Sequence, residues 1–414
     1  MAAFSPEASP ESSLSPWLFI VGIGEDGRAG LSLAATAALD RAGLVIGGRR
    51  HLDLAAPLSA ETLAWPSPLS DAYPAILARR GRPTCVLATG DPFHYGVGAE
   101  LARLVPAGEI AAFPQASAFS LAAARLGWPL AETVCLTLHG RAPERVIPHL
   151  QPGARLLVLS WDGTTPARLA GLLTERGFPR SRLTVLEAMG GPREHRRAGL
   201  AADFSENGID PLNTVAIEVA AEADARVIPL SPGLDDAWFE NDGQLTKAEI
   251  RAVTLAALRP RAGQLLWDVG AGSGSIGIEW CLRHAANRAV AVEAREERAA
   301  RIRRNALNLG VPDLRVVVGR APKSLTGLPA PDAAFLGGGV SDPALVEAVL
   351  EALPTGGRLV ANAVTLESEA LLLRLHSERG GSLRRLSVAR AEPVGHLTGW
   401  RPAMPVTQWA LTKP

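Results

Sequence analysis

The chain has 414 residues, which is long for one domain and comfortable for two. Its formal net charge is zero, which argues against nucleic acid as a general partner, and no apolar run is long enough to cross a bilayer, so we expect no membrane partner. The three cysteines are scattered without metal-ligand or redox spacing. They indicate reduced thiols in a cytoplasmic protein, and we expect no metal site.

The first predicted elements belong to an α/β domain. Residues 1–16 are rich in Ser, Pro and Glu, without the basic-then-apolar order of a signal peptide, and predict a disordered leader. From Trp17 short apolar runs alternate with Ala-rich helical stretches such as Leu31–Ala42 and Ala116–Leu126. This alternation predicts a largely parallel sheet. The expected strands are Trp17–Gly22, Thr84–Ala88, Glu109–Phe113 and Val134–His139.

A second lobe and a linker are predicted next. The rhythm of apolar runs and helices resumes after residues 151–153 and continues to near Ala221, so we expect lobes at about 17–113 and 114–228. Residues 229–245 begin with PLSPGLDD, a proline- and glycine-containing stretch without periodicity. Such a stretch is typical of a domain boundary, and residues 246–414 are predicted to form a second domain.

The second predicted domain is a regular βαβ series with a Rossmann-like fold. Its first helix is expected to open at Thr246, with Glu249 completing a capping box three residues later. The final apolar runs, Leu383–Ala391 and Val406–Leu411, have no helix between them and predict an antiparallel pair of strands. The earlier strands are expected at Leu265–Val269, Ala289–Glu293, Leu314–Val318, Ala333–Leu336 and Arg358–Ala361.

A glycine-rich turn lies between a strand and a helix in the sequence LLWDVGAGSGSIGI, residues 265–278. Glycines at 270, 272 and 274 let backbone approach a ligand closely, and the amides that open the following helix point toward it. Glu293 closes the next strand, where a carboxylate can accept hydrogen bonds from both hydroxyls of a ribose. The pattern therefore predicts a nucleoside pocket.

Two nucleoside ligands fit this turn. The spacing of Gly272, Gly274 and Gly277 satisfies the dinucleotide fingerprint. However, Asp268 at the strand end, with glycines Gly270, Gly272 and Gly274 at every second position after it, resembles the first motif of class I methyltransferases more closely. A carboxylate suits the cation S-adenosylmethionine, which we favour. A turn that serves only helix packing is the third alternative.

Other loops of this half are expected at the same edge of the sheet. The loop that contains Thr246 precedes the first helix, and Gly337 and Gly338 follow the fourth strand, where close backbone approach to a ligand is predicted. Arg320 cannot accept a hydrogen bond from an adenine amino group, so that contact either falls to the backbone of Ala321 or is absent. No Asn-Pro-Pro-Tyr tetrad follows the fourth strand, which argues against methylation of nucleic acid bases.

Three loops of the first half resemble those of the tetrapyrrole methylases. They are Trp17–Gly27 (WLFIVGIGEDG), Thr89–Phe93 (TGDPF) and Gln115–Ser120 (QASAFS). The segment Pro211–Val219 (PLNTVAIEV) adds to the resemblance. That family has a two-lobed α/β fold unrelated to class I and holds S-adenosylmethionine between its lobes. Glu25 and Asp26 stand where its first turn usually has proline. The resemblance implies donor contacts from Gly90, Asp91, Pro92 and Phe93, and from Ser117, Ala118 and Phe119.

Together the two halves resemble the decarboxylating precorrin-6Y methyltransferases of cobalamin biosynthesis, which fuse a tetrapyrrole methylase domain to a class I methyltransferase domain. The resemblance implies methylation of precorrin-6B at ring carbons 5 and 15 and loss of carbon dioxide from the carbon 12 acetate, giving precorrin-8X. It also implies one S-adenosylmethionine site per domain, with carbon 5 assigned to the first domain and decarboxylation and carbon 15 to the second. The partner is then a tetrapyrrole polycarboxylate, and a homo-oligomer is expected.

Residues that would handle such a substrate are harder to select. Arginines suit its carboxylates, and the candidates are Arg49, Arg283, Arg390 and Arg401. The closing segment RAEPVGHLTGWRPAMPVTQW is either a hairpin with a surface tryptophan or a flap with an aromatic wall and a guanidinium. We take His396 and Arg401 in it as candidate catalytic residues, His396 to protonate a ring carbon or steady the leaving carboxylate.

Two other functions remain open at the level of the sequence. An RNA or protein methyltransferase with an accessory domain would require a basic face, which the balanced charge does not indicate. A module that binds NAD through the glycine turn would leave the Thr89–Phe93 loop unexplained.

Overall fold

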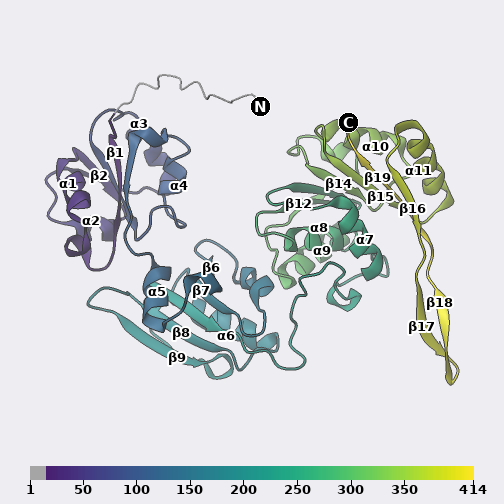
Figure 1. Cartoon of the computed structure of the whole chain (residues 1–414), viewed down its shortest axis with the longest axis horizontal. Helices are drawn as coiled ribbons and strands as arrows, with labels where there is room; N and C mark the ends of the chain where they lie inside the picture. The colour runs from purple at the N-terminus through teal and green to yellow at the C-terminus, as the bar shows by residue number, and fades with distance from the viewer. Residues whose placement is uncertain (1–14) are drawn as a thin grey trace, which may run out of the picture. The chain divides into compact units, whose positions relative to one another are not determined.

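The computed structural model describes residues 15–414, so the predicted leader lies almost wholly outside the described residues. The chain divides into two compact units (Figure 1). The first runs up to Arg141 and includes Pro152–Ala225, and the second comprises Ala142–Gln151 and Arg226–Pro414. Parallel strands alternating with helices confirm the α/β class in both.

The first lobe of the first unit is a parallel five-stranded sheet in the order β3-β2-β4-β1-β5. The short strands β2 and β3 were not predicted, because four residues are too few to show a period. The strands are β1 Leu18–Ile23, β2 Leu44–Gly47, β3 Glu61–Ala64, β4 Thr84–Thr89 and β5 Ile110–Phe113. The helices are α1 Leu33–Arg41, α2 Arg49–Ala55, α3 Tyr73–Leu77 and α4 Gly98–Leu101.

The second lobe has a mixed sheet in the order β6-β7-β10-β8-β9. Only β6 and β7 are parallel, so the prediction of a largely parallel sheet is wrong here. For β8 and β9 the physical reason is the short connection between them, since a parallel pair requires a longer crossover. The elements are α5 Ala118–Leu126, β6 Thr133–Thr137, β7 Arg155–Leu159, α6 Thr165–Glu175, β8 Arg182–Glu187, β9 His195–Leu200 and β10 Asn213–Glu218.

The second unit contains a seven-stranded sheet in the order β13-β12-β11-β14-β15-β19-β16. The predicted bounds of β11 and β14 are confirmed to the residue, and the antiparallel pairing of β16 with β19 is confirmed as well. The strands are β11 Leu265–Val269, β12 Arg288–Glu293, β13 Arg315–Val318, β14 Ala333–Leu336, β15 Arg358–Ala363, β16 Ser382–Leu386 and β19 Val406–Thr412. The helices are α7 Ala248–Leu258, α8 Ser275–Leu282, α9 Glu296–Asn308, α10 Pro343–Ala352 and α11 Leu366–Arg379.

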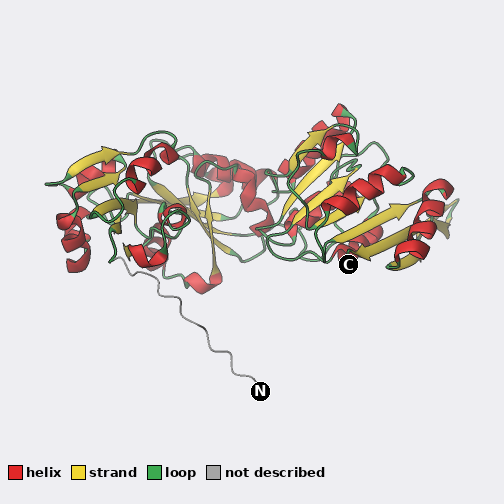
Figure 2. Ribbon diagram, turned by 90° about the horizontal axis from the view of Figure 1, so that it is seen from above, coloured by secondary structure: helices red, strands yellow, loops and turns green. Residues whose placement is uncertain are grey.

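Helices cover both faces of this sheet (Figure 2). Apolar residues of α10 and α11 pack on the face that carries Trp267, Leu336 and Ala361, forming one core cluster. The other face is covered by α7, α8 and α9, and Asp268 and Phe335 lie on it because successive side chains of a strand point to opposite faces. This second face of the sheet extends to the carboxyl ends of the strands.

The beginning of α7 differs from the prediction. The helix starts at Ala248 after Lys247, and no side chain caps it. The predicted capping box of Thr246 and Glu249 is therefore wrong. The Glu249 carboxylate instead accepts hydrogen bonds from the Arg390 guanidinium at 2.6 and 3.1 Å, a stronger charge-assisted contact than a neutral backbone amide would offer.

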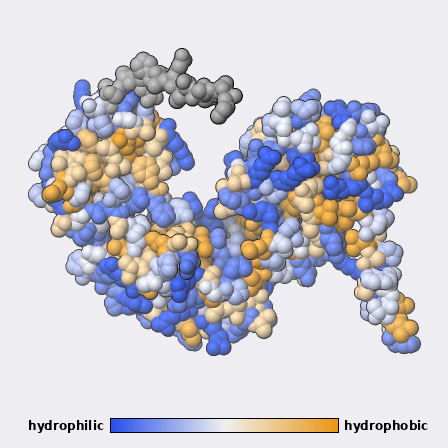
Figure 3. All heavy atoms as spheres, viewed as in Figure 1, coloured by the Kyte–Doolittle hydropathy of each residue, from blue (hydrophilic) through white to orange (hydrophobic). Residues whose placement is uncertain are grey.

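The closing segment forms a separate two-stranded hairpin of β17 (Ala389–Val394) and β18 (Leu397–Pro402), which extends away from the seven-stranded sheet (Figure 1). Its tip carries two exposed apolar residues, Val394 and Leu397. Figure 3 shows hydrophobic surface at this end of the hairpin. Trp400 is also 77% exposed. Among residues 15–414, no helix combines the length and apolar character that a membrane span requires.

Candidate functional site

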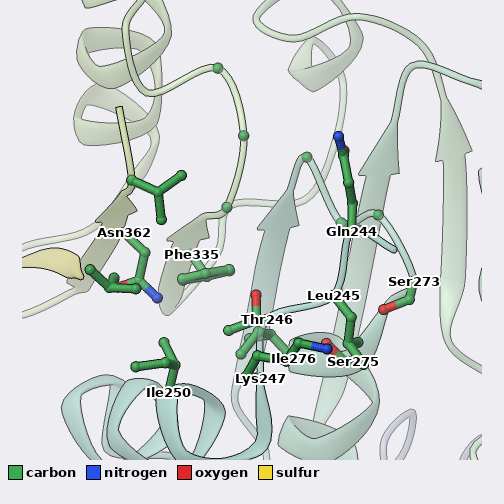
Figure 4. Close-up of a pocket in the computed structure, with 18 of the residues that line it drawn as sticks. Gln244, Leu245, Thr246, Lys247, Ile250, Ser273, Ser275, Ile276, Phe335 and Asn362 are labelled. Carbon is green, nitrogen blue, oxygen red and sulfur yellow. The ribbon is translucent and has the colours of Figure 1, made fainter. Parts of the chain in front are cut away.

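A cavity of about 1040 Å³ lies at the carboxyl ends of the parallel strands in the second unit. Open α/β sheets bind ligands at this edge. Figure 4 shows side chains that surround it, among them Gln244 and Thr246 from the segment before α7 and Asn362 from β15. Residues at or just after the ends of β11, β12, β13 and β14 form much of its wall, namely 270–273, 292–294, 319–321 and 337–339.

Most of the predicted donor-binding residues of this half come together at the cavity. Seven of them line it, namely Thr246, Gly270, Gly272, Glu293, Ala321, Gly337 and Gly338. The candidate Arg401 lines it too. Asp268 and Gly274 do not line it. The residues that the sequence pattern treated as one motif therefore fall into two groups, those that line the cavity and those that do not.

The three glycines of the turn have different neighbours. All three have positive φ (69°, 60° and 78°), which favours glycine. A Cβ added to Gly270 would lie 2.7 Å from the Gly338 nitrogen, and one added to Gly274 would lie 2.6 Å from a methyl of Ile302. At Gly272 the nearest atom would be the Gln244 carbonyl oxygen, 3.6 Å away. Gly272 is thus the glycine of this turn that leaves open space on the cavity side.

Asp268 lies beneath the turn. Its side chain is buried, and its Oδ2 accepts a hydrogen bond from the Gly277 amide at 2.9 Å, which holds the first turn of α8. Its Oδ1 is buried without a hydrogen-bond partner among the described residues. Burial raises the pKa of Asp268 to about 7, and the charge of Glu293 adds to that rise. Asp268 therefore supports the start of α8 below the turn, and its direct contact with a cationic ligand stays a prediction.

Glu293 combines burial with a place in the cavity wall. Its Oε2 accepts a hydrogen bond from the Gly272 amide at 2.9 Å, and its Oε1 accepts one from the Arg295 amide at 3.0 Å. Each carboxylate oxygen has a second lone pair, so the group can still accept hydrogen bonds from a ligand. The hydrogen bond from the Gly272 amide couples the position of the Glu293 carboxylate to that of Gly272.

The candidate catalytic residues are separated by the hairpin. Arg401 lines the cavity near the base of the hairpin and pairs with Glu392 at 2.9 Å. His396 lies in the exposed turn between β17 and β18 and does not line the cavity. Trp400 does not line it either. The segment is thus a hairpin with a surface tryptophan, whose base contributes a guanidinium to the cavity.

A buried arginine that the sequence analysis missed holds the edge of this cavity. Arg251 on α7 is fully buried and pairs with Glu279 and Asp236, both at 2.8 Å. It also donates to the carbonyl oxygens of Leu234 and Thr246. These bonds fasten the segment before α7 to the body of the second unit. The available signal was a charged residue inside an apolar helical pattern, which does not reveal its partners.

In the first unit, the loop after β4 meets the loop after β5. A Cβ on Gly90, whose φ is 56°, would lie 2.9 Å from the Ala116 oxygen and 3.0 Å from the Ser117 Cα. Asp91 accepts a hydrogen bond from the Phe93 amide at 2.8 Å. Pro92 after it is buried, whereas the Phe93 side chain is 47% exposed. The two predicted donor loops are therefore neighbours.

The predicted residues of the second loop serve α5. The Ser117 hydroxyl caps this helix by accepting a hydrogen bond from the Ser120 amide, and Ala118 is half-buried. Phe119 is 1% exposed, packs in the core of the second lobe and contacts the His94 ring in a tilted arrangement with ring centroids 4.7 Å apart. The Phe119 side chain is thus a packing residue, and the two loops keep backbone groups and Phe93 available at the strand ends.

A polar cluster near these loops was also missed. Glu25 stands in the first turn, where the resembling family usually has proline. Its carboxylate pairs with Arg50 and, at 3.6 Å, with Arg193 of the second lobe. The His51 Nε2 lies 2.8 Å from the hydroxyl of Thr89, the residue directly before Gly90. Burial and the Arg50 charge lower the pKa of His51 to about 4, so its ring is neutral at pH 7.

Comparison with known proteins identifies both units. Residues 18–204 match the model of the tetrapyrrole (corrin/porphyrin) methylases, and residues 237–413 match that of a precorrin methyltransferase domain. A Sinorhizobium relative named precorrin-6Y C(5,15)-methyltransferase [decarboxylating] is 55% identical over 406 residues, covering 98% of each chain. A Pyrobaculum calidifontis relative named probable cobalt-precorrin-6B C(15)-methyltransferase (decarboxylating) is 38% identical over 190 residues, covering 44% of this chain and 97% of that one.

A solved structure is similar as well. The C-terminal domain of precorrin-6Y C5,15-methyltransferase from Rhodobacter capsulatus is 47% identical, covering 45% of this chain and 100% of that one with a TM-score of 0.43.

Fold, cavity and family models together define a methyltransferase with a tetrapyrrole methylase domain and a precorrin methyltransferase domain. S-adenosylmethionine is the methyl donor that these families imply, and a small tetrapyrrole is the substrate. Within this class, the chain belongs to the precorrin-6Y C(5,15)-methyltransferase (decarboxylating) family of cobalamin biosynthesis.

Proposed function

We propose that this protein methylates precorrin-6B at ring carbons 5 and 15 and removes carbon dioxide from the carbon 12 acetate, giving precorrin-8X, with one S-adenosylmethionine site in each domain. The observation that carries the proposal is the near-complete match to a relative named for both methylations and the decarboxylation. The proposal takes residues 17–228 and 246–414 as the two catalytic domains, joined by 229–245.

In the second domain, we assign the donor to the part of the cavity formed by the ends of β11, β12 and β13. The residues present fit such a ligand, because Gly272 leaves open space beside the free lone pairs of Glu293. In this proposal Glu293 binds the ribose hydroxyls, the backbone of Ala321 lies at the adenine, and Thr246, Gly337 and Gly338 line the remainder. The donor supplies an electrophilic methyl group, so the chain's task is alignment of donor and acceptor.

The second domain is also assigned the decarboxylation. A relative of about the length of one domain is named for both carbon 15 methylation and decarboxylation, which supports placing these two activities together. The conjugated macrocycle can accept the electron pair that the departing carbon dioxide leaves, so the chemistry requires no additional cofactor. Arg401 near the base of the hairpin is assigned to substrate carboxylates. His396 is exposed in the hairpin turn, so no role is assigned to it.

The first domain is assigned the methylation of carbon 5. Its proposed donor contacts are the backbone of Gly90 to Phe93 and of Ser117 to Phe119, since these segments are adjacent at the strand ends. The zero net charge supports a small-molecule substrate and no nucleic acid or membrane partner. The proposal also includes a cytoplasmic location and a homo-oligomeric state.

Product analysis tests this assignment. The full chain is incubated with S-adenosylmethionine and precorrin-6B, and the products are resolved by mass spectrometry. We expect two methyl additions and one loss of carbon dioxide. Asp91→Ala removes the carboxylate that orders the Gly90–Phe93 turn, so carbon 5 methylation should fall at least about tenfold, as for loss of a charge-assisted hydrogen bond, with decarboxylation unchanged.

Asp71→Ala, at an exposed carboxylate in the same lobe, is the matched control and should behave as the wild type. Loss of both activities in Asp91→Ala would contradict the division of labour. A wild-type chain that yields no methylated product would contradict the proposed function itself.

A further inference from the structure

Three polar side chains form a network below the β15 end of the cavity. They are Thr254 on α7, Asn362 on β15 and Gln408 on β19. The Asn362 Nδ2 donates to the Thr254 hydroxyl at 2.9 Å, and the Gln408 Nε2 donates to the same hydroxyl at 3.2 Å and to the Asn362 Oδ1 at 3.0 Å. The Thr254 hydroxyl donates to the Ile250 carbonyl oxygen at 2.7 Å.

This pattern determines the orientation of the Asn362 amide. A hydroxyl has one proton, and that of Thr254 is given to the Ile250 carbonyl, so Thr254 can only accept from the two amides. Asn362 must therefore turn its nitrogen to Thr254 and its oxygen to Gln408. One N–H of Asn362 is left over, and it has no acceptor among residues 15–414.

Asn362 lies where this N–H can meet a ligand. The residue is half-buried and lines the cavity, and Figure 4 shows it beside Phe335 and near Ile250. In the sheet register Leu336 pairs with Ala361, so Asn362 is level with Gly337 at the strand ends. The ends of β11 and β12, which carry Gly272 and Glu293, lie on the other side of β14.

The surroundings of Asn362 leave it as an available donor. Ile250, Phe335 and Val406 make this part of the wall apolar, which strengthens a hydrogen bond formed there. Nearer the hairpin, Arg390 pairs with Glu249, and Arg401, which is assigned to other substrate carboxylates, pairs with Glu392. Asn362 is neutral, and its hydrogen bonds with Thr254 and Gln408 already orient its amide. It therefore loses little conformational freedom when it binds a ligand.

We propose that Asn362 is a positioning residue for the methyl acceptor, and that its unused N–H donates to a carboxylate which the tetrapyrrole retains. This inference rests on the proposed function and adds the contact that orients the macrocycle in the second domain. The carboxylate is a retained one because a donor on the departing carboxylate would stabilise the ground state and slow decarboxylation.

Steady-state kinetics of carbon 15 methylation by the full chain tests the contact. Asn362→Asp replaces the N–H by a negative oxygen of nearly the same shape, and we expect the KM for precorrin-6B to rise about tenfold or more, as for loss of a hydrogen bond to a charged group. The change in kcat should be smaller, because the reacting atoms are not contacted. Affinity for S-adenosylhomocysteine and methylation of carbon 5 should match the wild type.

Two variants on β19 separate orientation from packing. Gln408→Met removes the bond to the Asn362 oxygen and frees the amide to turn, so we expect a smaller rise in KM. Thr407→Val is the matched control, since the buried Thr407 hydroxyl has no hydrogen-bond partner within the described chain, and it should keep wild-type kinetics.

An unchanged KM in folded Asn362→Asp would overturn the inference. A lower KM would overturn it too, because the substrate would then meet the amide oxygen. Weaker binding of S-adenosylhomocysteine would likewise contradict a role restricted to the acceptor. If Asn362→Asp does not fold, Asn362→Ala removes the donor without adding charge, and its KM must rise for the inference to stand. Failure of the wild type to methylate carbon 15 would refute the proposed function instead.

Discussion

The glycine turns of the two units look alike in sequence but differ in what their glycines contact. In the first unit, a Cβ on Gly22 would lie 1.8 Å from the Gly90 oxygen, and Gly90 is itself packed on Ala116 and Ser117. These glycines let the end of β1 and the loops after β4 and β5 meet backbone to backbone. In the second unit Gly270 plays this part against Gly338, whereas Gly272 leaves open space beside the cavity.

The acidic residues of the two turns differ in the same way. Asp91 is half-buried and orders its own turn by accepting from the Phe93 amide. Asp268 is buried below the turn and holds the start of α8 through Gly277. A motif therefore identifies where a ligand loop lies, but neighbours distant in sequence decide which of its residues face the ligand and which support those that do.

The largest effect is expected when each of the two packed glycines, Gly270 and Gly90, is replaced by valine in a separate variant. Gly270→Val would clash with Gly338, and Gly90→Val with Ala116, and each also places a branched side chain at positive φ. Each should reduce the methylation assigned to its own domain about 100-fold or more, since a clash and backbone strain together exceed about 3 kcal/mol. Mass spectrometry of the products reports both methylations in one reaction.

Gly108→Val, where an added Cβ meets nothing within 4 Å, is the control for the size of the substitution. Loss of both methylations in either variant would show that the two turns are not independent.

An intermediate effect is expected at the carboxylate beside the open glycine. Glu293→Gln replaces an oxygen that accepts from a backbone amide by an NH₂ group, which cannot accept. We expect affinity for S-adenosylhomocysteine to fall about tenfold at the second domain's site, as for loss of a charge-assisted hydrogen bond. Calorimetric titration of the full chain measures it, with no change expected at the other site.

Glu297→Gln is the matched control, because the Glu297 side chain is 84% exposed four residues later in the chain. Equal weakening in both variants would contradict the assignment of Glu293.

A last effect concerns the pH dependence of stability rather than activity or binding. The pKa of Asp268 is about 7 in the folded chain, against an ordinary value of 3.8 for an aspartate, so between these pH values the folded state binds the extra proton. Stability from this group is therefore present at low pH and is lost as pH rises from about 4 to about 7. In Asp268→Asn this loss should shrink by more than about 1 kcal/mol, since each pKa unit corresponds to about 1.4 kcal/mol.

Chemical denaturation at several pH values gives the comparison between wild type and Asp268→Asn. A variant whose stability falls with pH as steeply as the wild type would show that Asp268 is not the group that titrates in this range.

The sequence by itself determined the α/β class, the family, and the extents of strands such as Leu265–Val269 and Ala333–Leu336. These follow from local patterns, because apolar runs, turn glycines and helical periodicity act over a few residues. It also located the loops that line the cavity, since parallel strands deliver their carboxyl ends to one edge.

Only the tertiary structure decided which of those residues line the cavity and which pack in the core or support neighbouring residues. The antiparallel strands of the second lobe, Phe119 in the core, Asp268 below the turn and His396 in the exposed hairpin turn all depend on partners far away in the chain. Asn362 is the clearest case, because its orientation needs Thr254 and Gln408, which lie 108 and 46 residues away. Through-space contacts of this kind leave no periodic signal in the sequence, so they emerge only when the chain is folded.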